Sequence, residues 1–140
     1  MPDAATIAEL RTGAFESCLL EGVLQVLISP GLALREPIAA EAVQRGLPVV
    51  GDIELFAREA KAPLAAITGT NGKSTVTALL AEVANAAGRA TIAGGNLGEP
   101  ALDLLERPVP ELYVLELSSF QLETTHSLAT ATATVLNVTP

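Results

Sequence analysis

Residues 64–75 read LAAITGTNGKST, and this stretch decides the fold. Its first four residues form a short apolar run, which is typical of a buried parallel strand. A loop with two glycines follows at residues 68–72, and beyond it apolar side chains recur at the spacing of a single helix face. That face comprises Val76, Leu79, Leu80 and Val83. A strand, a glycine loop and a helix in this order predict a phosphate-binding loop.

The residue types in the loop suit a bound phosphate. Gly69 and Gly72 permit positive φ angles and a close approach of the backbone to an anion. A helix that begins near Lys73 directs its unpaired N–H groups at the phosphate, the lysine can reach the β- and γ-phosphates, and the Ser74 hydroxyl can ligate Mg²⁺. The general pattern G-x-x-x-x-G-K-[ST] has a glycine where this chain has Ile67. The sequence therefore predicts a variant loop, with an ordinary glycine-rich turn as the alternative.

On both sides of the loop, short apolar runs alternate with helical periodicity, which predicts an α/β fold with parallel strands. Further strands are expected at residues 23–28, 48–50, 112–117 and 129–138. Helices are expected at residues 37–45, 52–60, 73–88 and 100–105. Asp52 is the expected cap of the second helix. Pro63 marks a junction, because proline disfavours helix in the residue before it.

Composition narrows the classes of function. The chain has 140 residues, is 49% hydrophobic and carries a net charge of −8, which argues against a nucleic-acid surface and a basic membrane-binding face. Its longest apolar stretch, residues 23–34, is too short to span a bilayer. Residues 1–5 lack the basic start of a secretory signal, so we expect a cytoplasmic protein without membrane insertion. Cys18, the single cysteine, is expected to be a buried small hydrophobe.

Four polar residues outside the loop have both functional and plainer interpretations. Glu116 lies in an apolar strand, where a carboxylate is costly unless paired or metal-bound; the alternative is a strand-end glutamate in solvent or beside a lysine. Asn96 lies in the glycine-rich turn 94–98 and could contact substrate or only shape the turn. Ser118 could orient substrate or start the following turn. His126, the single histidine, is expected to be a surface or capping residue.

The loop residues ITGTNGKST, 67–75, resemble the phosphate loop of the Mur ligase family, which also lacks the first glycine of the general pattern. Other segments resemble the branch of that family that adds D-glutamate: GGNLG at 94–98, LELSSFQLE at 115–123, GDIELF at 51–56 and SPG at 29–31. The resemblance covers nearly the whole chain and is weakest before Val23. It implies a Rossmann-like remnant of a UDP-binding domain over residues 1–62. It further implies the first half of a P-loop ATPase-type central domain over residues 63–140.

The resemblance also implies an activity, its cofactors and its substrates. The branch uses ATP and Mg²⁺ to join D-glutamate to UDP-N-acetylmuramoyl-L-alanine through an acyl phosphate, in peptidoglycan precursor synthesis. The implied ATP-binding residues are Gly69, Thr70, Asn71, Gly72, Lys73, Ser74 and Thr75. Lys73 and Glu116 are the implied catalytic residues, and Ser74 and Glu116 the implied Mg²⁺ ligands. The implied substrate contacts are Asn96, Ser118, Ser29, Pro30 and Gly31.

The length departs from the family pattern, because family members have three domains and this chain matches parts of two. We therefore expect a chain truncated at both ends, with poor or no ligase activity by itself, and a monomer at full length. Another amide ligase of the superfamily, adding a diamino acid or extending folate with glutamate, is one alternative. A non-catalytic nucleotide-binding remnant or partner module is the other.

Overall fold

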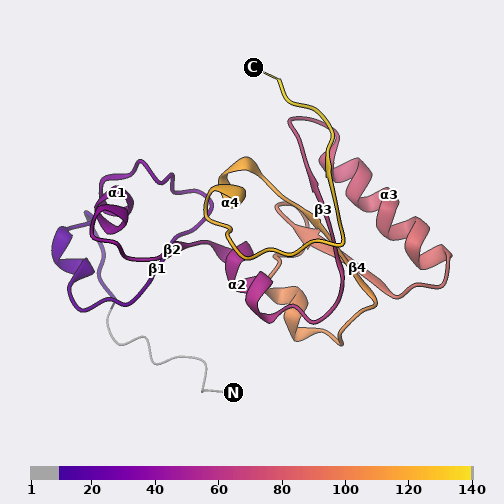
Figure 1. Cartoon of the computed structure of the whole chain (residues 1–140), viewed down its shortest axis with the longest axis horizontal. Coiled ribbons are helices and arrows are strands. Elements are labelled where there is room, and N and C mark those ends of the chain that lie inside the picture. The colour runs from indigo at the N-terminus through magenta and orange to yellow at the C-terminus, as the bar shows by residue number, and fades with distance from the viewer. Residues whose placement is uncertain (1–9, 140) are drawn as a thin grey trace.

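The computed structural model describes residues 10–139. Figure 1 shows a smaller part with β1, β2 and α1 on one side and a larger part built on a second sheet on the other. Residues 1–5, on which the expectation about a leader rests, lie outside the described range. Within that range, no helix has the length and apolar character needed to cross a membrane.

The smaller part is a two-stranded parallel sheet. β1 (Val26–Leu27) and β2 (Val49–Val50) pair in parallel, and α1 (Pro37–Gln44) connects them. α1 starts with a proline, whose missing N–H would have no partner in the first turn. A small core of Leu20, Ile28, Ala42 and Val49 holds this part together, and Leu20 comes from the 3-10 helix η1 (Ser17–Leu20). The first strand is shorter than the expected 23–28.

α2 (Asp52–Glu59) packs against the larger part, although it precedes the expected junction at Pro63. Its Ile53 and Phe56 are fully buried in a core shared with the larger sheet, and the Phe56 ring meets the Tyr113 ring edge-on at 5.1 Å. The expected cap was wrong: Gly51 occupies the cap position and Asp52 is the first helical residue. A Cβ at Gly51 would collide with the Thr124 hydroxyl, so a larger residue at the cap would force the Thr124 side chain to move.

The larger part is a four-stranded parallel sheet in the order β4-β5-β3-β6. Its strands are β3 (Leu64–Thr68), β4 (Thr91–Gly95), β5 (Leu112–Glu116) and β6 (Thr132–Val135). The short helices η2 (Asp103–Glu106) and α4 (Ser119–Glu123) follow β4 and β5. These parallel sheets confirm the predicted α/β class. Residues 91–93, expected only to lead into the glycine turn, form a strand at the sheet edge.

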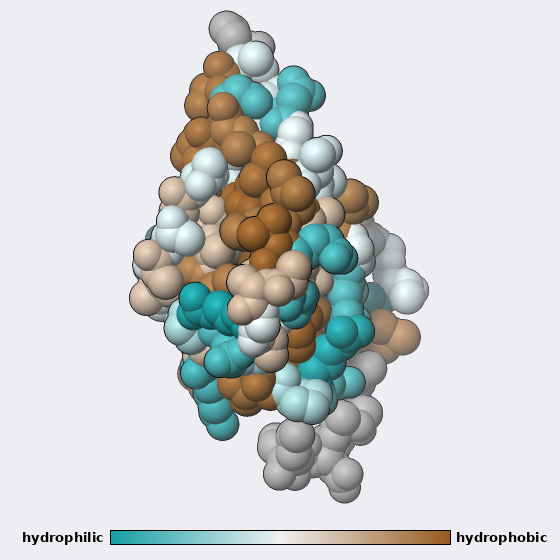
Figure 2. All heavy atoms as spheres, turned by 90° about the vertical axis from the view of Figure 1, so that its right-hand side faces the viewer, coloured by the Kyte–Doolittle hydropathy of each residue, from teal (hydrophilic) through white to brown (hydrophobic). Residues whose placement is uncertain are grey.

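α3 (Lys73–Ala86) covers one face of this sheet, and its inward face differs from the predicted one. Val76, Leu80 and Ala84 pack on the sheet, whereas Leu79 and Val83 are 60% and 57% exposed. Val76, Leu80 and Ala84 are four residues apart and lie along one line of the helix, and this line faces the sheet, whereas Leu79 and Val83 lie to the side of it. Figure 2 views the side of α3 and shows apolar side chains gathered there.

Candidate functional site

The phosphate loop, residues 69–72, joins β3 to α3. Gly69 and Gly72 adopt φ angles of +140° and +82°, a region that favours glycine. A Cβ at Gly69 would lie 3.1 Å from the backbone nitrogen of Asn137, so a close neighbour also requires glycine there. Ile67, which replaces the first glycine of the general pattern, is buried in β3 beneath α3 and takes no part in the turn.

A C-terminal segment, residues 136–139, holds the loop in shape. The N–H of Thr70 donates to the Asn137 carbonyl at 3.1 Å, and the N–H of Asn71 donates to Asn137 Oδ1 at 2.8 Å. Asn137 Nδ2 returns a hydrogen bond to the Asn71 carbonyl at 3.0 Å, and Thr139 N donates to Thr70 Oγ1 at 3.2 Å. These contacts leave the N–H groups at the start of α3, which helix geometry keeps free, as the donors for an anion.

Lys73 folds back over the loop. Its Nζ donates to the Gly69 carbonyl at 2.8 Å, so the ammonium group lies at the loop before any ligand arrives. A groove of about 470 Å³ opens between the loop and the start of α4, and Lys73, Ser118 and Phe120 contribute to its walls. We call it the loop groove. A phosphate oxygen in this groove would give the ammonium group a charged partner in place of the carbonyl.

Strand register brings Glu116 beside the loop. Ile67 on β3 and Gly95 on β4 are both paired with Glu116 at the end of β5. The Glu116 side chain is 3% exposed, and its Oε1 accepts a hydrogen bond from Asn96 Nδ2 at 2.9 Å. Both plainer alternatives were wrong, because the carboxylate is buried and this partner is an amide rather than a lysine. Its Oε2 is buried without a hydrogen-bond partner.

Glu116, whose Oε2 is buried without a partner, lines a hollow of about 180 Å³ under the start of α3, which we call the Glu116 hollow. Ser74, Thr77, Gly94 and Leu97 also line it. Mg²⁺ prefers oxygen ligands and is usually held by one or two carboxylates together with substrate phosphates and waters. A carboxylate with an unpartnered oxygen and a serine hydroxyl, on residues that line the same hollow, fit that donor set. The described residues contain no cluster of three or more His, Cys, Asp or Glu side chains arranged for a metal.

Ser118 has a structural role that the sequence left open. It caps α4: its Oγ accepts from Gln121 N at 3.2 Å, and its N–H donates to Gln121 Oε1 at 3.0 Å. Gln121 is buried and also donates from Nε2 to Asp52 Oδ2 at 3.0 Å. Gln121 was missed as an important residue, although serine followed three positions later by glutamine is the spacing of a capping box.

A second buried carboxylate, Glu54 on α2, was also missed. It accepts hydrogen bonds from the N–H groups of His126 and Ser127 at 2.7 and 2.8 Å, from Ser127 Oγ at 2.9 Å and from Arg58 Nε at 3.0 Å. Burial alone would raise the pKa of Glu54, but these donors outweigh it and lower the pKa to about 2. His126 itself is exposed, as expected for a surface residue.

The turn of Ser29, Pro30 and Gly31 lies at the carboxyl end of β1. Its Ser29 carbonyl accepts from the N–H of Leu32 at 2.9 Å. None of the three residues lines the loop groove or the Glu116 hollow. The structure thus brings five candidate residues to one end of the larger sheet: Lys73, Ser74, Asn96, Glu116 and Ser118. The turn of residues 29–31 lies at the smaller sheet instead.

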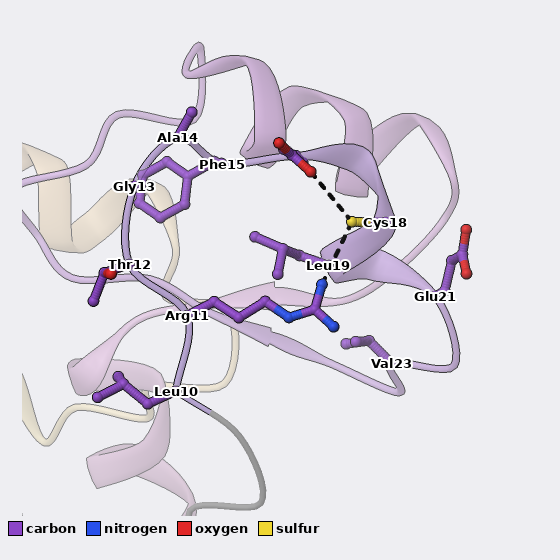
Figure 3. Close-up of a pocket in the computed structure, with 11 residues that line it drawn as sticks. Leu10, Arg11, Thr12, Gly13, Ala14, Phe15, Cys18, Leu19, Glu21 and Val23 are labelled. Atoms are coloured by element: carbon purple, nitrogen blue, oxygen red, sulfur yellow. Dashed lines mark hydrogen bonds between the residues drawn. The ribbon is translucent and has the colours of Figure 1, made fainter.

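A larger hollow of about 750 Å³ lies in the segment before β1 (Figure 3) and contains none of the candidate site residues. Cys18 on its wall is exposed, so the expectation of a buried cysteine was wrong. The short helix η1 turns Leu20 into the core and directs Cys18 away from it. Arg11 Nη1 donates to the Cys18 sulfur at 3.5 Å, and the thiol donates to a Glu16 carboxylate oxygen at 3.7 Å.

Comparison with known proteins agrees with the resemblance. The family model of the Mur ligase middle domain matches residues 67–140. The UDP-N-acetylmuramoylalanine–D-glutamate ligase of Nitrosococcus oceani is 59% identical over 139 residues, which are 99% of this chain and 30% of that protein. The ligase of the same name from Pectobacterium atrosepticum is 63% identical over 131 residues, again 30% of its length. The chain thus spans about a third of these relatives.

One solved structure supports the fold alone. It is the UDP-N-acetylmuramate:L-alanyl-gamma-D-glutamyl-meso-diaminopimelate ligase from Neisseria meningitides, with a TM-score of 0.51 and 20% sequence identity. The match covers 91% of this chain and 46% of that chain. Shared architecture over most of the chain, at this low identity, agrees with the parallel sheets described above.

Proposed function

The chain belongs to the Mur ligase family, and from this premise we propose that it forms the ATP-handling part of a ligase that joins D-glutamate to UDP-N-acetylmuramoyl-L-alanine. The observation that carries the proposal is the Glu116 hollow beside the phosphate loop. There, a buried carboxylate oxygen without a partner lies near the start of the helix that follows the loop. The substrates come from the names of the relatives, and the geometry of the loop and the hollow supports the binding of the nucleotide.

In this proposal the phosphate loop and the start of α3 hold the phosphates of ATP. The residues are Gly69, Thr70, Asn71, Gly72, Lys73, Ser74 and Thr75. Lys73, now bonded to the Gly69 carbonyl, would turn to the β- and γ-phosphates. Ser74 and Glu116 would hold Mg²⁺, which when bound neutralises charge on the phosphate oxygens. The protein would contribute mainly positioning and fixed charge, which is what phosphoryl transfer requires.

The reaction proceeds in two group transfers. A carboxylate oxygen of UDP-N-acetylmuramoyl-L-alanine attacks the γ-phosphorus of ATP, which forms an acyl phosphate and releases ADP. The amine of D-glutamate then attacks the acyl carbon, the C–O bond to phosphate breaks, and inorganic phosphate leaves while the surplus amine proton passes to water. Asn96, which donates to Glu116, and Ser118, which lines the loop groove, would contact the muramoyl end of the substrate. The turn of residues 29–31 would contact the uridine end.

The full-length protein would act in the cytoplasm as a monomer, in peptidoglycan precursor synthesis. We expect the 140-residue chain by itself to be insufficient for turnover, because catalytic groups must be held near their working geometry and the relatives are about three times longer. A non-catalytic module would bind Mg-ATP in the same loop but release no phosphate with any amino acid. Another amide ligase of the superfamily would release phosphate with a different amino acid.

The test is phosphate release by the full-length protein, given ATP, Mg²⁺, UDP-N-acetylmuramoyl-L-alanine and single amino acids. We expect release that depends on D-glutamate and falls by roughly 100-fold or more in Lys73→Ala, because a charge that faces the transferring phosphoryl group is lost. Lys61→Ala is the matched control, since Lys61 is exposed and lines none of the hollows described above. Release that ignores D-glutamate would refute the substrate assignment.

A further inference from the structure

The Glu116 hollow contains a second buried oxygen without a partner, the hydroxyl of Thr77. Thr77 is 6% exposed, and its Oγ1 makes no hydrogen bond to the backbone or to any side chain. Thr77 and Glu116 both line the hollow, and each has one buried oxygen without a hydrogen-bond partner. Buried polar atoms are nearly always hydrogen-bonded, so two unpartnered oxygens on residues that line one hollow favour a bound water or ligand between them.

The position of Thr77 on α3 explains how it reaches the hollow. It follows Ser74 by three residues, and side chains three apart lie on the same face of a helix. A threonine inside a helix usually returns its hydroxyl to a backbone carbonyl one turn back, and Thr77 does not. A valine would fill the same space without a polar atom to satisfy. The hydroxyl is therefore not required by the packing of α3 on the sheet.

We propose that Thr77 is a positioning residue of the cation site: its hydroxyl holds a water molecule of the hydrated cation and links that water to Glu116. The inference rests on the proposed function, in which Ser74 and Glu116 hold Mg²⁺. Mg²⁺ gives up water reluctantly and keeps several waters in protein sites. A hydroxyl both donates and accepts, so it can connect such a water to a carboxylate. The hollow of about 180 Å³ has room for a cation with several waters, since one water occupies roughly 30 Å³.

The experiment measures binding rather than turnover. The full-length protein is titrated with a non-hydrolysable ATP analogue, once with Mg²⁺ and once with EDTA, and the ratio of the two dissociation constants gives the contribution of the cation. Thr77→Val keeps the shape and removes the hydroxyl, and Thr77→Ser keeps the hydroxyl. Thr124→Val is the matched control, because Thr124 is also buried but donates to the Gln121 carbonyl at 3.3 Å. The melting temperature of each protein is measured without metal or nucleotide.

We expect Thr77→Val to reduce the Mg²⁺-dependent gain in affinity by about tenfold, as is typical when a residue that orients a metal's ligands is removed. Its affinity for the analogue in EDTA should be unchanged. The metal-free variant should melt about 2 °C higher, because an unsatisfied buried hydroxyl is gone. Thr77→Ser should keep the gain. Thr124→Val should melt at a lower temperature and should also keep the Mg²⁺-dependent gain in affinity. If Thr77 served only the fold, Thr77→Val would not both raise the melting temperature and weaken cation binding.

Two results would overturn the inference, and they are distinguishable. If the wild-type protein gains affinity from Mg²⁺ and Thr77→Val gains as much, Thr77 does not serve the cation site and the proposed function stands. If the wild-type protein gains nothing from Mg²⁺, the proposed cation site itself fails and the inference fails with it. Thr77→Ser keeps the test valid if the valine variant does not fold, since loss of the gain in a folded serine variant would also contradict the proposal.

Discussion

Glu54 and Glu116 are both buried glutamates, 2% and 3% exposed, and they differ in how completely their oxygens are used. Both oxygens of Glu54 accept hydrogen bonds, from α2 itself and from residues 126 and 127. Glu116 has a bond from Asn96 on Oε1 and none on Oε2. Burial alone therefore does not identify a functional carboxylate. The saturated carboxylate of Glu54 joins two segments of the chain, whereas the unpartnered oxygen of Glu116, on a residue that lines the Glu116 hollow, is the one that the proposed function assigns to a cation.

The largest expected effect comes from Glu116→Gln. The variant keeps the size of the side chain and loses the charge that faces the hollow, so phosphate release by the full-length protein should fall by roughly 100-fold or more. Its unfolding free energy should change by less than about 1 kcal/mol, because the open oxygen contributes no internal hydrogen bond. Steady-state kinetics and urea unfolding measure the two quantities. A large loss of stability with normal turnover would show that Glu116 serves the fold, as Glu54 does, and not the reaction.

Glu54→Gln should show the opposite pattern. An amide cannot accept from all four donors around Glu54, and it removes the charge that strengthens them, so the unfolding free energy should fall by about 2–3 kcal/mol. The folded variant should bind the ATP analogue with unchanged affinity, because Glu54 lines neither the loop groove nor the Glu116 hollow. Urea unfolding and calorimetric titration measure these effects. Weaker nucleotide binding in the folded variant would show that the two sites are coupled.

Lowering the pH should reduce the difference in unfolding free energy between the wild-type protein and Glu54→Gln. The pKa of Glu54 lies at about 2 in the folded protein and near 4.5 when it is unperturbed. A lowered folded-state pKa contributes stability above the unfolded pKa, and this contribution is lost as the pH falls through the folded one. The stability difference between the two proteins should thus be full at pH 6 and shrink steadily between pH 4.5 and pH 2. A difference that does not change with pH would contradict the role of the charge.

The smallest expected effect concerns Ser118, which is proposed to contact substrate and is seen to cap α4. Ser118→Ala should lower the unfolding free energy by about 1 kcal/mol, the usual effect of losing a helix cap. Ser118→Asn can cap the helix equally well without adding a charge, but it replaces the hydroxyl beside the loop groove. If Ser118 only caps α4, the asparagine variant recovers both stability and the KM for UDP-N-acetylmuramoyl-L-alanine. Recovered stability with a raised KM would support the substrate contact.

Local patterns predicted the parts of the fold that depend on neighbouring residues. The loop at 69–72, the strand before it and the helix after it follow from glycines, short apolar runs and helical spacing. The face of α3 that packs on the sheet was predicted only in part, because both sides of that face carry apolar residues. Leu79 and Val83 satisfy the helical spacing as well as Leu80 does, and only the position of the sheet distinguishes them.

Contacts between residues far apart in the chain could not be predicted from the sequence. Glu54 is bonded to residues that follow it by 72 and 73 positions, and no periodicity connects the two segments. Asn137, which shapes the loop, falls at the end of an apparent strand, where an asparagine looks like an ordinary turn residue. The resemblance named Glu116 and Ser74, but the open oxygen of Glu116 and its nearness to Thr77 follow from strand register.

The bonds from Asn137 to Asn71 also have a consequence for how the protein is made. The two residues are 66 positions apart, so the loop leaves the ribosome well before the residue that shapes it exists. At about 5–20 residues per second, the delay is roughly 3–13 seconds. Within that interval β3 also waits for its neighbours, because β5 is complete only at residue 116 and β6 only at residue 135. The nascent chain therefore carries the loop sequence for several seconds before the residue that shapes the loop has been added.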